Sequence, residues 1–327
     1  MKTTDQEILR ALRKAGPGYV SGEDLAARLE ISRAAVWAHV DGLRAAGLHI
    51  VAVPHLGYQL VGMDDVLVAD DFLAQLDTQI VGREIIVFAE TGSTQDVVGK
   101  MAAEGRAAEG LVVLAELQKK GRGRQGRPWH SHRGKGLWFS VLLRPPWPPM
   151  AATRLTALTA VAVARALERE TGIRVHIKYP NDIYAGDSKL AGILTELHTE
   201  IDRVRFAIVG IGINVNQQTG DFSGELRGRA TSVRMETGRP HLRAPLAVEL
   251  LRELDSLYQE ALEGHFAAIT REWTERCSTL GRRVVVRLGA TQVQGVAEGL
   301  DKDGALRVRT GPGRVETVPG GDVFLEK

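Results

Sequence analysis

Cysteine is almost absent from this chain of 327 residues. Its single cysteine, Cys277, can form neither an internal disulfide nor a zinc site made of several thiolates. This usage is typical of proteins in a reducing cytoplasm, where we expect this one to work. A charge excess is missing too, because 42 lysines and arginines stand against 40 acidic residues, a net charge of +2. Any site for nucleic acid or phosphate must therefore be local.

Long apolar runs and a signal segment are also missing. No apolar run approaches the length of a transmembrane helix, and the opening MKTTDQEILR has no apolar signal core. Both absences predict a protein without a membrane partner. The composition, 44% hydrophobic and 25% charged, is ordinary for a globular protein. The length exceeds what one hydrophobic core usually serves, so we expect two or three domains.

Residues 1–63 have the pattern of three helices followed by a hairpin. The stretch DQEILRALRKAG has helical periodicity, Ser21 can cap SGEDLAARLE, and Ser32 can cap SRAAVWAHVDGLRAAG. Two short apolar runs around Pro54 and Gly57 predict the hairpin. This is the order of a winged helix-turn-helix, whose last helix enters the major groove of DNA.

The last of these helices carries the residues that we expect to contact DNA: Ser32, Arg33, Trp37 and Arg44. An outward tryptophan on such a helix is costly unless it contacts something. The alternative is a small three-helix module whose basic face is only solvated.

The stretch GRGRQGRPW, residues 121–129, fits the pattern G-x-G-x-x-G. A dinucleotide-binding turn needs a strand before this pattern and a helix that opens inside it. A strand is expected at residues 110–117, but Pro128 disfavours helical geometry, and loop residues follow. The chain also has no G-x-x-x-x-G-K-[ST] phosphate loop. The sequence therefore excludes both common nucleotide-binding loops.

What remains is a loop from Lys119 to Lys135 with seven lysines or arginines and no acidic residue. Its glycines permit movement, and such a loop suits an anion that binds and is then enclosed. The alternative is a disordered basic loop on the surface. Trp129 and the pair Trp138–Phe139 favour a binding site, because a purely solvated loop would not need aromatic residues.

Five stretches together resemble the biotin protein ligases. AELQKKGRGRQGRPW looks like their biotin-binding loop, KYPNDIY like their K-[WY]-P-N-D segment, and KLAGILTE like the strand whose lysine serves the active site. GSTQD and GIGINVN resemble the family's ligand-contacting Ser-Thr pair and its glycine-rich strand end. Because a winged helix precedes them, the chain resembles the bifunctional subgroup, which is ligase and biotin operon repressor in one.

The resemblance implies an ATP-dependent ligase that forms biotinyl-5′-AMP and transfers biotin to a lysine of the biotin carboxyl carrier protein of acetyl-CoA carboxylase. It implies biotin, ATP and Mg²⁺ as ligands. It further implies operator DNA as a partner and a ligand-promoted homodimer that represses biotin biosynthesis genes.

Two rival functions remain open. A lipoate or octanoate transferase has a similar fold, but those relatives lack a G-R-G-R lid. A biotin-sensing DNA-binding regulator without ligase activity would not need Lys189, Asp182 and both loop arginines, all of which are present.

The resemblance also assigns roles to individual residues. The catalytic set is Lys189, Arg122, Arg124 and Asp182. The biotin-binding set is Ser93, Thr94, Gln118, Gly121, Arg122, Gly123, Arg124, Trp129, Lys189, Gly210 and Gly212, with Trp129 as a lid over the biotin ring. The nucleotide-binding set is Arg122, Arg124, Asn181, Lys189 and Asn214. No metal ligands can be named from the sequence.

These residue types suit the chemistry. Fixed cations offset the repulsion between two anionic reactants, and a carboxylate can accept the proton of an attacking lysine amine. Some of these roles have a structural alternative. Asp182 follows Pro-Asn and could be a turn residue, and Ser93 and Thr94 could cap the helix that follows them.

Two departures from the family's pattern are expected to matter. Bifunctional relatives place an aromatic residue on the adenine, in the loop after the Asn214 strand, and here the candidates are Phe222, Arg227 and Arg229. Relatives can also carry a nucleotide-facing arginine at the extreme C-terminus, where this chain has Glu326.

The rest of the chain completes an α+β multidomain protein. Strands alternate with amphipathic helices in the middle, which predicts a mixed, mostly antiparallel sheet with helices on one side, the class II synthetase-like fold of the biotin ligases. From about Gly281, short strands with glycine turns predict a small SH3-like barrel. The predicted domains are residues 1–63, winged helix-turn-helix; 64–278, catalytic; and 279–327, SH3-like.

Overall fold

A computed structural model describes residues 3–325 except residues 201 and 290. The chain forms two compact units, one of Met1–Asp77 with Leu242–Val248 and one of Thr78–His241 with Glu249–Lys327. The predicted boundaries after residues 63 and 278 remain predictions.

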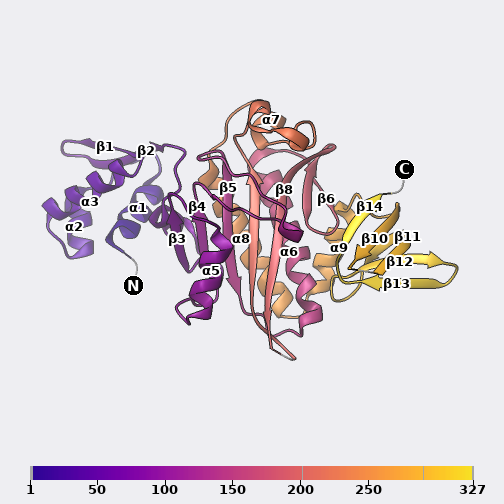
Figure 1. Ribbon diagram of the computed structural model, residues 1–327. Helices are drawn as coiled ribbons and strands as arrows, with labels where there is room; N and C mark the ends of the chain where they lie inside the picture. Colours follow the sequence, from indigo (N-terminus) through magenta and orange to yellow (C-terminus); the bar gives the residue numbers. More distant parts are fainter. Residues whose placement is uncertain (1–2, 201, 290, 326–327) are drawn as a thin grey trace. The chain divides into compact units, whose positions relative to one another are not determined.

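The first unit is a helix-turn-helix followed by a hairpin, as predicted (Figure 1). Its elements are α1 (Thr4–Ala15), α2 (Gly22–Leu29), α3 (Arg33–Ala45), β1 (Leu48–Val53), β2 (Gly57–Met63) and α4 (Ala69–Gln75). Ser21 and Ser32 cap α2 and α3 with their side-chain oxygens, which removes unpaired amides from both helix starts. Ile8, Val36 and Val40 are fully buried, so one apolar stripe from each of α1 and α3 forms the core.

A seven-stranded sheet lies at the centre of the second unit. Its strands are β3 (Glu84–Phe88), β4 (Leu111–Ala115), β5 (Gly136–Leu143), β6 (His176–Lys178), β7 (Asp182–Ala185), β8 (Ser188–Thr199) and β9 (Val204–Asn214). They run in the order β3-β4-β5-β9-β8-β7-β6. β3 and β4 pair in parallel, and the other neighbours pair antiparallel. The predicted mixed, mostly antiparallel sheet is confirmed.

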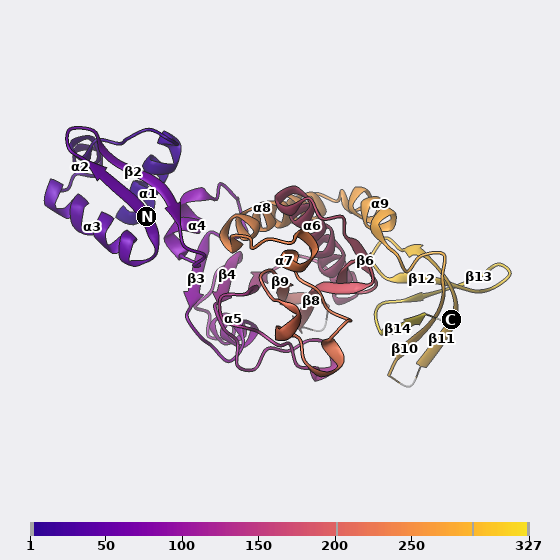
Figure 2. The ribbon, with the colours of Figure 1, turned by 90° about the horizontal axis from the view of Figure 1, so that it is seen from above.

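Helices cover both faces of this sheet, so the expectation of helices on one side was wrong (Figures 1 and 2). α5 (Thr94–Ala103) lies over one face, where Gly99 approaches Ile208 of β9. α6 (Thr153–Thr171) lies over the other face, where the Thr156 hydroxyl forms a hydrogen bond with the Thr195 hydroxyl. Thr195 of β8 pairs with Val209 of β9 and so lies on the same face as Val209. Neighbouring strand residues point to opposite faces, so the two helices are on opposite sides. The sequence pattern marks α6 as apolar but does not say which face it covers.

Helix α6 and the turn before it, Pro149–Thr171, are long and apolar enough by composition to cross a membrane, which the sequence interpretation did not anticipate. Most of this helix is buried within the domain, and that burial is what a core helix requires. The remaining helices are α7 (Val233–Thr237), α8 (Arg243–Leu262) and α9 (Phe266–Arg276), with single 3-10 turns at residues 124–126, 149–152, 219–221 and 224–226.

The C-terminal strands form a separate five-stranded antiparallel sheet. They are β10 (Arg283–Leu288), β11 (Thr291–Leu300), β12 (Leu306–Gly311), β13 (Arg314–Val318) and β14 (Asp322–Leu325), in the order β13-β12-β11-β10-β14. The short strands and glycine turns are confirmed. The strand pairings of the described residues do not close this sheet, so the SH3-like barrel remains a prediction.

Candidate active site

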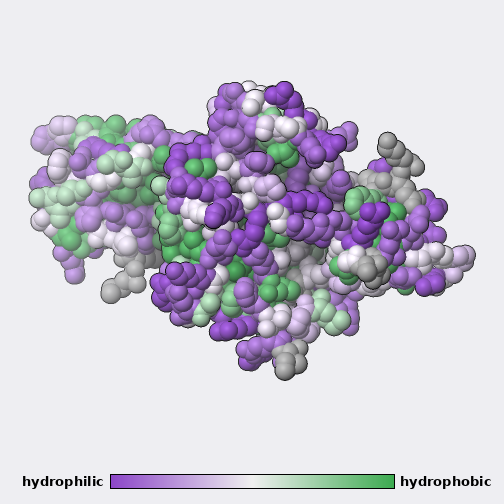
Figure 3. All heavy atoms as spheres, in the orientation of Figure 1, coloured by the Kyte–Doolittle hydropathy of each residue, from purple (hydrophilic) through white to green (hydrophobic). Residues whose placement is uncertain are grey.

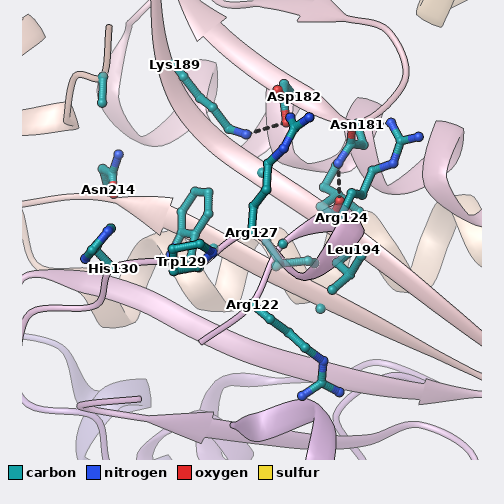
Figure 4. A pocket seen from close by; sticks show the side chains of 18 of the residues that line it. Arg122, Arg124, Arg127, Trp129, His130, Asn181, Asp182, Lys189, Leu194 and Asn214 are labelled. Atoms are coloured by element: carbon teal, nitrogen blue, oxygen red, sulfur yellow. Dashed lines mark hydrogen bonds and ion pairs between the residues drawn. The ribbon is translucent and has the colours of Figure 1, made fainter. Parts of the chain in front are cut away.

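A cavity of about 570 Å³ opens on the α5 face of the central sheet. Its walls come from the loop Lys119–Lys135, called the lid loop below, and from β7, β8, β9 and β14. This volume lies within the usual range of small-molecule sites. The cavity brings together most of the residues that the sequence assigned to biotin, nucleotide and catalysis (Figure 4).

The floor of the cavity is made of glycines that accommodate the indole of Trp129. A Cβ atom at Gly212 would lie 2.6 Å from Trp129 Cε2, and one at Gly192 would lie 2.9 Å from Trp129 Cζ3. Any side chain at these positions would displace the ring. Trp129 was expected to cover the biotin ring as a lid, but here it packs onto β8 and β9. The sequence singled out Gly212, whereas Gly192, inside KLAGIL, was missed.

Lys189 and Asp182 form an ion pair on this face, with 2.6 Å between Nζ and Oδ1 (Figure 4). A β-bulge brings them together. Ile183 pairs with Ala191 and Tyr184 pairs with Lys189, so Leu190 is an extra residue in β8. The bulge turns Lys189 to the same face as Asp182 and Gly192. Asp182 lies in a strand, which excludes a purely turn-forming role.

The buried Oδ1 of Asp182 is occupied by Lys189, whose ammonium lies 2.6 Å away. A substrate amine that approaches this oxygen must therefore share it with Lys189 or displace Lys189 from it.

A chain of hydrogen bonds fixes the polar side of the cavity. Thr94 donates its backbone amide and its hydroxyl to Gln118 Oε1, at 2.8 and 3.1 Å, and lies 2.8 Å from the Ser140 hydroxyl. Ser93 holds the N-cap position of α5 but makes no side-chain cap hydrogen bond. The capping alternative therefore does not account for the Ser93 side chain, which is buried beside the cavity.

Arg122 faces away from the Lys189–Asp182 pair (Figure 4). Its guanidinium donates to both carboxylate oxygens of Glu196 at 3.0 Å and to Asp96 at 2.6 Å. The Glu196 hydrogen bonds, with those of Asp96, raise the pKa of Arg122. Neither acidic partner was identified from the sequence, because both belong to elements distant from the lid loop. In this arrangement Arg122 is not brought together with Lys189.

Arg124 connects the lid loop to the segment that carries Asp182. It donates to Asn181 Oδ1 at 3.3 Å and to the Gly321 carbonyl at 2.9 Å (Figure 4). Asn181 in turn donates its side-chain amide to the Ile193 carbonyl of β8. Asn181 is thus fixed in place and presents its oxygen to an arginine.

Acidic residues outside the lid loop pair with several of its basic side chains. Glu90 pairs with both Lys119 and Arg133, and Asp221 pairs with Lys135 at 2.5 Å. The only helical turn is short, with Gln125 at a φ of 56°. This geometry confirms that the lid loop is not a Rossmann turn, and the cationic binding site remains a prediction.

The segment after β9 closes the far end of the cavity. The Lys189 amide donates to the Arg229 carbonyl, and Thr231 donates back to Lys189. Asn214 is buried and donates its side-chain amide to the Thr231 carbonyl at 3.0 Å. Of the three adenine candidates, Phe222 and Arg229 line the cavity and Arg227 does not. Glu326 lies outside the described residues.

The expected DNA-binding residues differ in exposure. Trp37 is 56% exposed on α3, and Figure 3 shows apolar side chains over α3 and the β1–β2 hairpin. Ser32 and Arg33 are exposed at the helix start. Arg44 is half-buried, and its Nε donates to the Ile50 carbonyl at 2.7 Å. Arg44 therefore holds β1 against α3 rather than lying free on the outer face.

Comparison with known proteins agrees with this layout. The profile of the Biotin/lipoate A/B protein ligase family matches residues 87–214, an HTH domain matches residues 4–59, and the Biotin protein ligase C terminal domain matches residues 279–326. The bifunctional ligase/repressor BirA of Bacillus subtilis is 36% identical over 99% of both chains. The chain belongs to the biotin/lipoate A/B protein ligase family.

Other relatives have the same character. The bifunctional ligase/repressor BirA of Escherichia coli is 32% identical, with 94% of this chain and 93% of that protein covered. Among solved structures, the biotin protein ligase of Aquifex aeolicus in complex with biotin and ATP is 29% identical, covers 75% of this chain and 99% of its own, and has a TM-score of 0.64. The prediction of a bifunctional ligase with an N-terminal helix-turn-helix domain is confirmed; the residue roles remain predictions.

Proposed function

We propose that this ligase joins biotin to ATP as biotinyl-5′-adenylate and then transfers the biotinyl group to a lysine of a biotin carboxyl carrier protein. The observation that carries the proposal is the Lys189–Asp182 pair, held at 2.6 Å in a cavity beside a cationic lid loop. Lys189 of this pair serves the anionic reactants of the first step, and Asp182 serves the acceptor amine of the second. An anhydride-forming ligase needs both.

The biotin ring is proposed to bind between Trp129 and the polar chain of Ser93, Thr94 and Gln118. The indole supplies a flat apolar wall, and the hydroxyl and amide groups can satisfy a ureido group. Trp129 Nε1 is buried and has no hydrogen-bond partner among the described residues, so a ligand oxygen could supply one. Gly121, Gly123, Gly210 and Gly212 let backbone and indole lie close to the ligand.

In the first step, a biotin carboxylate oxygen attacks the α-phosphorus of ATP, and the bond to the leaving pyrophosphate breaks. Both reactants are anionic, so fixed positive charge lowers the barrier. Lys189 provides it from a strand, while Arg124 and Arg122 provide it from the lid loop. Arg122 must exchange Glu196 and Asp96 for the ligand, and we propose that it does so when the substrates arrive.

The nucleotide is proposed to extend toward the segment after β9. Phe222 and Arg229 line that end of the cavity, so they are the proposed adenine contacts in place of the aromatic residue of bifunctional relatives. Asn181 and Asn214 provide polar groups along the way. Arg227 is not retained as a candidate.

In the second step, the acceptor lysine amine attacks the acyl carbon, and AMP leaves as the anhydride bond breaks. The amine must be neutral to attack, although its reference pKa is about 10.4. We propose that Asp182 orients the amine and accepts its proton.

Mg²⁺ is proposed to arrive with the ATP phosphates rather than in a cage of protein ligands. Among the described residues, no group of three or more His, Cys, Asp or Glu side chains could hold a metal ion. Mg²⁺ commonly binds through substrate phosphates with few protein ligands.

Regulation is the second half of the proposed function. We propose that the helix-turn-helix unit binds operator DNA as a ligand-promoted homodimer in the cytoplasm and represses biotin biosynthesis genes. The exposed Trp37 on α3 supports DNA contact, and dimers read two half-sites. Cys277 is a free, buried thiol whose pKa is raised by burial, which suits a reducing compartment.

The experiment that tests the ligase proposal follows biotinyl-adenylate and pyrophosphate by mass spectrometry after the protein meets biotin, ATP and Mg²⁺. Omission of each reactant in turn should abolish both products. Replacing biotin with lipoate or octanoate should yield far less adenylate. Equal or better use of lipoate would overturn the choice of biotin.

A further inference from the structure

The C-terminal sheet makes direct contact with the lid loop through two arginines. Arg124 donates to the Gly321 carbonyl at 2.9 Å, and Arg127 donates to Asp322 Oδ2 at 3.2 Å. Val323 and Phe324, the next residues of β14, line the cavity beside them. The start of β14 is therefore part of the cavity wall.

The segment that receives these arginines packs closely against β10. Gly321 has a φ of +110°, and a Cβ atom there would lie 2.5 Å from the Arg287 carbonyl oxygen, so only glycine fits. Asp322 then pairs with Arg287 of β10 in the antiparallel ladder. A hydrogen bond also connects the C-terminal sheet to the segment before β7, because the buried Tyr179 hydroxyl donates to the Val318 carbonyl at 3.2 Å.

The lid loop is the adaptable side of this contact. It contains Gly121, Gly123, Gly126 and Gly134, and glycine permits backbone conformations that other residues avoid. Its Arg127 is 67% exposed, whereas Asp322 is only 19% exposed. A fixed, mostly covered carboxylate thus faces an arginine on a segment that can move. An ion pair of this kind is weak enough to break and reform in each turnover.

We infer that Asp322 and the Gly321 carbonyl form a latch that holds the lid loop down over the adenylate. This inference rests on the proposed function, since it concerns retention of the intermediate made there. Asp322 is a positioning residue: it acts through Arg127 and the lid loop and not on the reacting atoms. Without the latch, the lid loop spends more time open, so the adenylate escapes and water reaches the anhydride.

The test compares three variants with the parent protein. Two are the single substitutions Asp322→Asn and Asp322→Glu. The third is a charge swap, a double variant that carries both Arg127→Asp and Asp322→Arg. The matched control is Glu298→Gln, which removes another exposed ion pair of the same sheet, the pair with Arg309. Each protein is first loaded with adenylate by incubation with labelled biotin and ATP. Unlabelled biotin is then added in excess, and the loss of bound label is measured over time. First-turnover pyrophosphate release and thermal melting are measured on the same samples.

Asp322→Asn should lose adenylate about two- to fivefold faster, because an ion pair of this exposure contributes up to about 1 kcal/mol. First-turnover release and melting temperature should stay at the parent's values. Asp322→Glu and the charge swap should recover most of the retention, and Glu298→Gln should match the parent.

Retention equal to the parent's in Asp322→Asn would overturn the latch while leaving the ligase proposal intact. A charge swap that is no better than Asp322→Asn would also overturn it, since a specific pair must be restorable. A parent protein that forms no adenylate at all would instead contradict the proposed function. The three results are distinguishable because preloading of the parent is measured first.

Discussion

Lys189 and Asp182 meet in an ion pair of 2.6 Å because Leu190 bulges out of the β7–β8 ladder. In a regular ladder Lys189 would share the face of Ala191, two residues along, and would point to the α6 side. The bulge re-aims its side chain into the cavity. The proposed catalytic pair therefore depends on one extra residue in a strand.

The substitution Lys189→Ala should nearly abolish adenylate formation. Loss of a fixed group that stabilises developing charge commonly costs about 10²–10³-fold in rate. Pyrophosphate release with saturating biotin measures this step, and melting temperature reports whether the fold is kept. Lys100→Ala, on the exposed part of α5, is the matched control and should behave as the parent. Near-normal release in Lys189→Ala would remove Lys189 from the mechanism.

The substitution Gly212→Ala should displace Trp129 and weaken biotin binding. The added Cβ would lie 2.6 Å from the indole, and overpacking of this kind costs about 1–3 kcal/mol, which corresponds to roughly five- to 150-fold in affinity. Calorimetric titration with biotin checks the affinity. Gly299→Ala is the control, because a Cβ there meets nothing within 4 Å. Unchanged affinity in Gly212→Ala would show that the indole does not shape the biotin site.

Protonation of His176 should lower the thermal stability of the protein in mild acid. Burial, and then the neighbouring Lys178, lower the pKa of His176 below its ordinary 6.5, although Asp187 opposes them. The folded state thus favours the neutral ring. This contribution is complete above pH 6.5 and is lost as pH falls through the folded-state pKa, because the unfolded chain binds the proton more readily. Melting curves between pH 8 and 5 should fall less steeply for His176→Gln than for the parent. Parallel curves would contradict the assignment.

The substitution Trp37→Ala should weaken operator binding and leave ligation intact. An exposed aromatic side chain at the centre of an interface contributes about 2 kcal/mol, roughly thirtyfold in affinity. Gel shifts on the biotin-operon promoter of the source organism, with biotin and ATP present, measure the effect. Sedimentation of the same samples shows whether ligand promotes the dimer. If the gel shift is the same with and without the Trp37→Ala substitution, and with and without ligand, the repressor half of the account is contradicted.

Local chemistry made much of this structure predictable. Ser21 and Ser32 cap their helices as the sequence indicated, and Pro128 ends any helix in the lid loop. Long-range placement was not predictable in the same way. The sequence around Leu190 contains no residue that would have predicted a bulge there. The acidic partners of Arg122 come from α5 and β8, which are distant from the lid loop in the sequence. Arg44 of α3 donates to the Ile50 carbonyl in the hairpin that follows the helix, and a helical wheel of α3 alone does not reveal this contact.

Transfer of labelled biotin tests the central claim most directly. The parent protein is incubated with labelled biotin, ATP, Mg²⁺ and a biotin carboxyl carrier domain, beside the same domain with its acceptor lysine changed to arginine. The account predicts that label becomes covalent on the unaltered domain and that Asp182→Asn forms adenylate but transfers it slowly. Absence of covalent label from the parent reaction, under conditions where the protein is folded and binds biotin, would contradict it.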